Sequence, residues 1–158
     1  MESKNKNSIK KISVMINKIL GRNLNMGKYS DRLLLQKLVY IMQNLGLDSN
    51  YTFSWYIRGP YSPELANAYD EFSLKYPRGE AILGRKEKEI VEKMKEVFGI
   101  ELNNSEKMEL YASLVYLFKE EKIPLESLER VIKLRKPWFS SNEIKKGIEI
   151  LRQLGVTT

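Results

Sequence analysis

Residues 31–72 constrain the fold of this chain more than any other stretch of the sequence. They open with a broad apolar pattern whose members are spaced three and four residues apart: Leu34, Leu38, Ile41 and Leu45. Further apolar residues widen this stripe, which predicts a helix that is contacted on more than one side. Ser30 or Asp31 can cap the start of the helix, and Gly46 can adopt the left-handed conformation that ends it.

The next segment predicts a short β-strand that leads into a second helix. Every second residue from Phe53 to Ile57 is large and apolar, which is the period of a half-buried strand. Residues 59–60, Gly-Pro, are expected to break the strand because proline has no N–H to donate to a sheet ladder. Ser62 as an N-cap, followed by Pro63 at the first helical position, predicts a new helix.

The turn between strand and helix has two interpretations. It can be no more than a well-built connection between two elements. Alternatively, Arg58, Tyr61 and Glu64 are displayed around the turn as a rim that binds a protein partner. The second interpretation follows from the frequent placement of functional residues on loops held by rigid elements.

Several of these motifs carry a resemblance to a known family. They are LQKLVY at residues 35–40, FSWY at 53–56 and GPYSPEL at 59–65. Together with LRKPWFS at 134–140, followed by Glu-Ile at 143–144, they resemble the Panacea domain. That family includes the SocA-like antitoxins and, more similar to this chain, the YwgA-like proteins of bacteria and archaea.

The resemblance touches roughly residues 30–153 and implies a compact, mainly helical domain. In the characterised antitoxin members, the implied role is to neutralise or deliver a toxin through protein contacts. The YwgA-like proteins imply no activity that can be carried over. Arg58 departs from the pattern, because the family often has tyrosine before Gly-Pro. A cation at that position changes what the turn could hold.

The composition removes most catalytic chemistries. The chain has 158 residues, a length suited to one domain, and contains neither cysteine nor histidine. Thiolate or imidazole metal sites, cysteine nucleophiles and histidine general bases are therefore excluded. The glycine-rich loops that cradle phosphates are also missing from the sequence. We expect a protein that is not an enzyme and that needs no cofactor or metal.

Positive charge is concentrated at the N-terminus. Residues 1–28 hold seven Lys or Arg against Glu2 alone, which is +6 of the net +7. We expect residues 1–7 to form a disordered basic tail. Residues 8–158 are expected to form a single helical domain that begins with a helix lined by isoleucines. The lysines of this segment can simply be solvated, or they can rest on nucleic-acid phosphates. The candidate phosphate contacts are Lys4, Lys6, Lys10, Lys11 and Lys18.

A second basic candidate lies near the C-terminus, where two predicted helices meet in a pattern that can be read as a helix-turn-helix. Cations beside an aromatic residue would suit phosphate contact and base stacking. The residues in question are Arg130, Lys133, Arg135, Lys136 and Trp138. The competing interpretation is that Trp138 and Phe139 staple the last helix to the core, beside a capping box formed by Ser140 and Glu143.

Taken together, the sequence predicts a mainly α, compact single-domain helical bundle with a small β-hairpin or strand pair near residues 51–61. The expected function is a non-catalytic, antitoxin-like interaction module that binds a protein partner. The alternative is a DNA- or RNA-binding accessory protein that uses the basic N-terminal segment. No apolar run approaches the roughly 20 residues that span a membrane, so we expect a cytoplasmic protein without membrane contact.

Overall fold

The computed structural model describes residues 2–73 and 82–157, with side chains from Ser8 onward. In these ranges the elements follow one another as α1 (Glu2–Leu20), α2 (Tyr29–Asn44), β1 (Ser54–Tyr56), β2 (Gly59–Tyr61), α3 (Pro63–Ala66), α4 (Tyr69–Phe72), α5 (Arg85–Phe98), the 3-10 helix η2 (Gly99–Asn103), α6 (Ser105–Lys119), α7 (Leu125–Arg135) and α8 (Ser141–Leu154).

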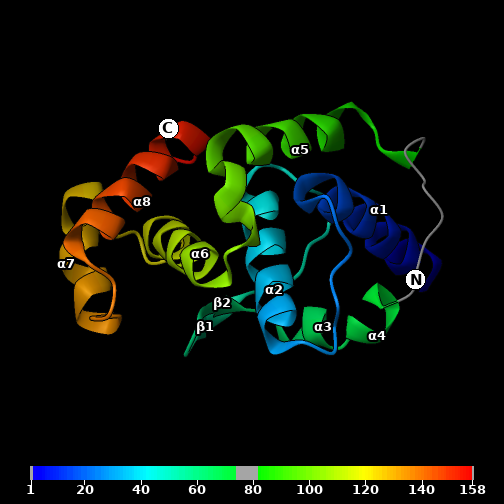
Figure 1. Ribbon diagram of the computed structural model, residues 1–158, viewed down its shortest axis with the longest axis horizontal. Helices are drawn as coiled ribbons and strands as arrows, with labels where there is room; N and C mark the ends of the chain where they lie inside the picture. Colours follow the sequence, from blue (N-terminus) through cyan, green and yellow to red (C-terminus); the bar gives the residue numbers. More distant parts are fainter. Residues whose placement is uncertain (1, 74–81, 158) are drawn as a thin grey trace.

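Two helices, α2 and α6, pack against each other at the centre of the molecule (Figure 1). Helices α1 and α5 pack together on one side of this pair, and α7 and α8 on the other. Strand β2 contacts both α2 and α6, so the hairpin is attached to the central pair. The predicted compact helical fold with a small hairpin near residues 51–61 is confirmed.

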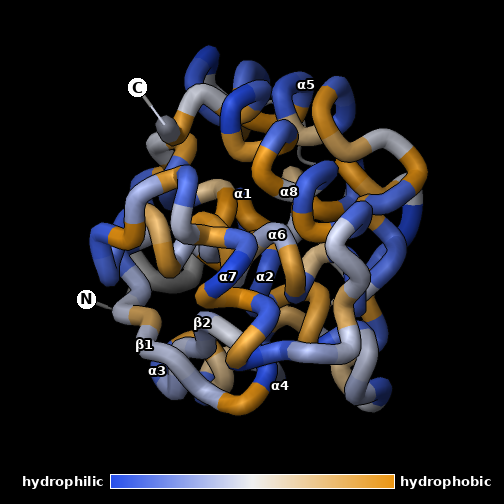
Figure 2. Tube along the Cα trace, turned by 90° about the vertical axis from the view of Figure 1, so that its left-hand side faces the viewer, coloured by the Kyte–Doolittle hydropathy of each residue, from blue (hydrophilic) through white to orange (hydrophobic). Residues whose placement is uncertain are grey.

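The central position of α2 and α6 follows from their sequences. Residues 33–42 of α2 and 108–115 of α6 are buried without interruption. A helix that is apolar around most of its circumference must be covered on several sides. Along α5, by contrast, hydrophobic and hydrophilic segments alternate in Figure 2, and its buried residues share one face. Such a helix covers the core from outside. The prediction of a helix contacted on more than one side is confirmed for α2.

Strands β1 and β2 form an antiparallel hairpin in which Trp55 lies opposite Pro60 and Tyr56 opposite Gly59. The expectation that Gly59-Pro60 would break the strand is therefore wrong. Proline is tolerated because a two-stranded sheet has only edge strands, whose outer N–H groups need no partner. Ser62 then caps α3 by accepting a hydrogen bond from the Leu65 N–H (3.1 Å), as predicted.

The first helix begins at Glu2, so its backbone includes residues 2–7, which the sequence marked as a tail. The helix continues into the polar segment because lysine and glutamate have good helix propensity once a following turn is docked. Ile9, Ile12 and Ile16 provide that docking and are buried.

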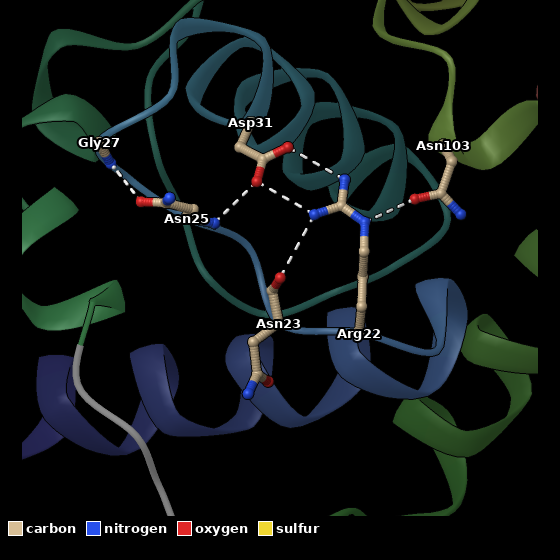
Figure 3. A network of polar contacts seen from close by, with 6 residues as sticks. All are labelled: Arg22, Asn23, Asn25, Gly27, Asp31 and Asn103. Atoms are coloured by element: carbon tan, nitrogen blue, oxygen red, sulfur yellow. Dashed lines mark hydrogen bonds and ion pairs between the residues drawn. The ribbon is translucent and has the colours of Figure 1, made fainter.

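The end of α1 is joined to the start of α2 by a polar network (Figure 3). The Arg22 guanidinium donates two hydrogen bonds to the buried Asp31 carboxylate, both 3.0 Å, and a third to Asn103 Oδ1 at 2.9 Å. The Asn25 backbone N–H also donates to Asp31, at 2.7 Å. Hydrogen bonding from Arg22 lowers the pKa of Asp31 from its ordinary value. The Asp31 carboxylate therefore fixes the α1–α2 connection. It does not cap α2, because it accepts hydrogen bonds from Arg22 and Asn25 and not from N–H groups of that helix.

The junction between α7 and α8 separates two neighbouring aromatic residues. Phe139 is 5% exposed and packs into the core, whereas Trp138 is 60% exposed. The predicted capping box is confirmed, because Ser140 Oγ accepts from the Glu143 N–H and the Glu143 carboxylate accepts from the Ser140 N–H. Only Phe139 thus serves as the predicted staple. Among the helices that the structure describes, none has the length and apolar character to cross a membrane.

Candidate functional site

Two buried lysines donate hydrogen bonds to backbone carbonyl groups at the turn of the hairpin. Lys37, on α2, donates through Nζ to the Pro60 carbonyl oxygen at 2.6 Å. Lys136, directly after α7, donates to the Ile57 carbonyl oxygen at 3.1 Å. The Lys37 and Lys136 side chains are both almost fully buried. Elements from both halves of the chain therefore fix the backbone of one turn.

A single carboxylate, that of Glu109 on α6, faces this pair of lysines. Glu109 is 1% exposed and receives a 2.9 Å hydrogen bond from Lys136 Nζ. The Arg58 guanidinium lies 3.5 Å from the other carboxylate oxygen, and its side chain is 48% exposed. Three cations thus surround one acid. A buried pair of this kind contributes little net stability, but the loss of one partner leaves an uncompensated charge.

Burial has a marked effect on Lys37. Desolvation lowers its pKa from 10.5 to about 7, and the neighbouring Lys136 and Arg58 act in the same direction, while Glu109 opposes them. An amine with such a pKa could act as a base or nucleophile. However, Lys37 is 0% exposed in this conformation, so a substrate cannot reach it. Its hydrogen bond to the Pro60 carbonyl oxygen indicates a structural role, which is to hold the turn.

The lowered pKa of Lys37 predicts a pH dependence of stability. Between about pH 7 and 10, the unfolded chain keeps this lysine protonated while the folded chain releases the proton. The free energy of unfolding should therefore rise with pH in this window, by at most about 1.4 kcal/mol per pH unit from this group.

Urea unfolding between pH 6.5 and 9.5 measures this effect. Lys37→Met should flatten the rise, whereas Lys145→Met, at an exposed position on α8, should leave it intact. Burial raises the pKa of Tyr111, and of other tyrosines, so the series should stop before tyrosine titration reverses the slope. An identical slope in wild type and Lys37→Met would contradict the assignment.

An exposed surface lies directly above the buried charges. We call Tyr56, Ile57, Arg58 and Trp138 the hairpin surface. Ile57 is 89% exposed, Trp138 60% and Tyr56 46%. Lys136 Nζ, which holds the Ile57 carbonyl, also lies 5.4 Å from the centre of the Trp138 ring. Ile57 and Trp138 are therefore both held next to the Lys136 ammonium.

The predicted protein-binding residues do not form one continuous rim. Arg58 lies at the tip of the hairpin, whereas Tyr61 pairs with Ser54 at its open end. Tyr61 still borders the hairpin surface, because its ring packs against that of Tyr56 at 4.9 Å. Glu64 is exposed beyond the open end, where its carboxylate accepts a 3.3 Å hydrogen bond from the Thr52 N–H.

Sequence reasoning missed Ile57 and Trp138 as protein-binding candidates, together with the buried ions beneath them. A usable signal was present for the ions. Lys37 and Glu109 are charged residues inside otherwise apolar helical runs. A charged side chain at such a position would be buried, and burying a charge is costly unless it is paired with an opposite charge. The sequence gives no comparable sign that Ile57 is exposed, because the alternating pattern of residues 53–57 predicted that its side chain lies on the buried face of the strand.

The C-terminal basic candidates are mostly engaged within the protein. Arg135 makes two 2.8 Å hydrogen bonds to the Glu121 carboxylate and lies over the Trp55 ring. Lys133 donates to the Phe139 carbonyl oxygen at 2.5 Å. Arg130 is exposed. Including Lys136 in a phosphate-binding patch is wrong, because its ammonium is buried against Glu109.

The N-terminal basic candidates lie on a different side of the molecule. Lys11 pairs with Glu87 at 3.5 Å, Lys10 is half-buried, and Lys18 also interacts with the rest of the protein. The side chains of Lys4 and Lys6 lie outside the described part of the structure. Helices α1 and α7 lie at opposite ends of the long axis (Figure 1), so the two basic segments do not form one surface.

The described residues contain no group of three or more acidic side chains arranged to hold a metal ion. Comparisons with protein-family models, with curated proteins and with solved structures found no match to this chain.

Proposed function

We propose that this chain is a non-catalytic interaction module that binds a protein partner through the hairpin surface. The observation that carries the proposal is the 89% exposure of Ile57 on a turn whose carbonyl groups are held by two buried lysines. A large apolar side chain on a fixed backbone can bury area against a partner with little loss of conformational entropy. Tryptophan, tyrosine and arginine, which surround it, are the residues enriched in binding hot spots.

The chemistry of the surface indicates the kind of partner. Trp138 and Ile57 would fit an apolar depression on the partner's surface. Arg58 would pair with a carboxylate beside that depression. Arg58 has spare donor capacity, because it approaches Glu109 only at a long 3.5 Å, and that carboxylate already receives a 2.9 Å hydrogen bond from Lys136. The motif resemblance to the Panacea domain supports an antitoxin-like role, in which this partner is a toxin.

Binding to DNA or RNA is the alternative function, supported by the net charge of +6 in residues 1–28. The ion pair of Lys11 with Glu87 and the separation of the two basic segments weaken it. Fluorescence anisotropy with duplex and single-stranded oligonucleotides decides between them. Affinity that falls steeply with salt, and falls further when residues 1–7 are deleted, would favour the alternative.

Partner capture should depend on the hairpin surface and not on exposed apolar residues in general. We expect Ile57→Ser and Arg58→Ala each to weaken capture by about tenfold or more, as hot-spot residues do. Stability should change by less than about 1 kcal/mol, because both side chains are substantially exposed.

Ile100→Ser provides the matched control, since Ile100 is 95% exposed but lies on η2. The measurement is affinity capture from the source cells, quantified by mass spectrometry, with urea unfolding of each variant in parallel. If Ile100→Ser loses the same partners as Ile57→Ser, the hairpin surface is not the binding site. If Arg58→Ala unfolds the protein, Arg58 is structural.

A further inference from the structure

A pocket of about 200 Å³ lies where the C-terminal ends of α2 and α6 meet, and none of its lining residues belongs to the hairpin surface. The last turns of α2, the segment before β1 and the residue that ends α6 contribute its walls. The lining residues are Tyr40, Gln43, Asn44, Tyr51, Phe53 and Glu120.

The electrostatics of this pocket favour a cation. The C-terminus of an α-helix carries partial negative charge, and here two helices end at the same place. Glu120, the C-cap residue of α6, adds a full negative charge and makes no ion pair within the described residues. The pocket lining that the structure describes includes no Lys or Arg. An anion would therefore be repelled.

Tyr40 gives an independent sign that a polar group is missing. Its side chain is 3% exposed, it lines the pocket, and its hydroxyl has no hydrogen-bond partner. Burial and the nearby Glu120 raise the pKa of Tyr40, so the phenol remains neutral and can accept a hydrogen bond. A buried hydroxyl without a partner costs free energy that a bound donor would recover.

The remaining walls are already held in place. Gln43 donates to the Tyr51 carbonyl oxygen at 3.0 Å and accepts from the Tyr51 N–H at 2.9 Å, which fixes one aromatic wall. The Phe53 ring packs edge-on against Tyr40 at 5.1 Å. Asn44 uses its Nδ2 to bind the Tyr40 carbonyl oxygen, which leaves its Oδ1 as an acceptor. The aromatic walls and the Asn44 amide are thus positioned before any ligand arrives.

We propose that this pocket binds an alkylammonium group. The three N–H donors of an ammonium match the Glu120 carboxylate, the Asn44 Oδ1 and the Tyr40 hydroxyl, and aromatic rings attract cations in addition. The volume is below the roughly 300–1,000 Å³ of sites for drug-sized ligands, so the pocket suits a head group or side chain. The ammonium belongs either to a free aliphatic diamine or to a lysine side chain of a peptide.

Titration with cadaverine, followed by ¹⁵N–¹H NMR, tests the proposal. Shifts should be confined to residues around 40–53 and 116–121, and 1,5-pentanediol, the neutral analogue, should cause none. Glu120→Gln should raise the Kd about tenfold by removing the ion pair and its charge-assisted hydrogen bond. Glu126→Gln, an exposed acid in the first turn of α7, should leave it unchanged.

Tyr40→Phe should weaken binding about threefold to tenfold by removing one acceptor, without loss of stability, because the hydroxyl it deletes has no partner. A parallel titration with the peptide acetyl-Gly-Lys-Gly-amide, and its glutamine counterpart, distinguishes the two sources of the ammonium. Binding of cadaverine supports a free diamine, and binding of the lysine peptide alone supports a side chain. No binding of either, or an unchanged Kd in Glu120→Gln, overturns the proposal.

Discussion

Replacing Glu109 with alanine should reduce the free energy of unfolding by about 3–5 kcal/mol. Glu109 is the carboxylate that compensates the buried ammonium of Lys136, 2.9 Å away, and it also offsets the charges of Lys37 and Arg58. Without it, the buried Lys37 and Lys136 side chains, with Arg58 beside them, would lose their counter-charge. Either an ammonium must lose its proton or the hairpin must lift to admit water.

Urea unfolding followed by circular dichroism gives the size of this loss. Glu106→Ala is the matched control, since Glu106 is on the same helix but exposed, and it should cost less than about 1 kcal/mol. The double variant Glu109→Ala, Lys136→Met should recover part of the loss, because it removes both members of the pair. Equal stability of Glu109→Ala and Glu106→Ala would mean that the buried charges are not coupled.

Gly59→Val should be similarly damaging, with a loss of about 3–5 kcal/mol. Gly59 has a φ of +88°, a conformation that a β-branched residue tolerates poorly, and a Cβ there would collide with Ser113 Oγ on α6. The hairpin would have to move away from α6, which would also separate the Ile57 and Pro60 carbonyl groups from their lysines.

Two comparisons separate conformational strain from collision. Gly21→Val places the same side chain at a φ of +72° with no other atom within 4 Å of its Cβ, so it reports strain alone. Gly59→Val in a Ser113→Ala background removes the colliding oxygen, which has no hydrogen-bond partner, and should restore part of the stability. Identical losses in Gly59→Val and Gly21→Val would show that the approach to α6 is not tight.

The features that could be predicted from the sequence are those set by local interactions. The broad apolar stripe that includes Leu34, Leu38 and Ile41 predicted α2 as a helix contacted on more than one side, and the spacing around Ser62 and Ser140 located two helix starts. The period of two near residues 53–57 located the hairpin. Each of these depends on neighbours within about one or two turns of chain, where spacing and capping chemistry determine the outcome.

The composition of the candidate site depended on contacts across the fold. Lys37, Glu109 and Lys136 are far apart in the sequence and meet only because α2, α6 and the end of α7 converge beneath the hairpin. Lys136 was predicted to be a surface cation, and Trp138 was given two opposing roles. Whether a charged side chain is solvated or buried is decided by which partner lies within hydrogen-bonding distance, and linear spacing does not contain that information.

The sequence by itself therefore determined that the fold is mainly helical with a small hairpin, and where α3 and α8 begin. Only the tertiary structure decided that Pro60 pairs in a strand, that Ile57 is exposed and that the ends of α2 and α6 meet at one pocket. The physical reason is the range of the forces involved. Helix formation and capping are satisfied within a few residues, whereas buried charges and pockets exist only where distant segments exclude water together.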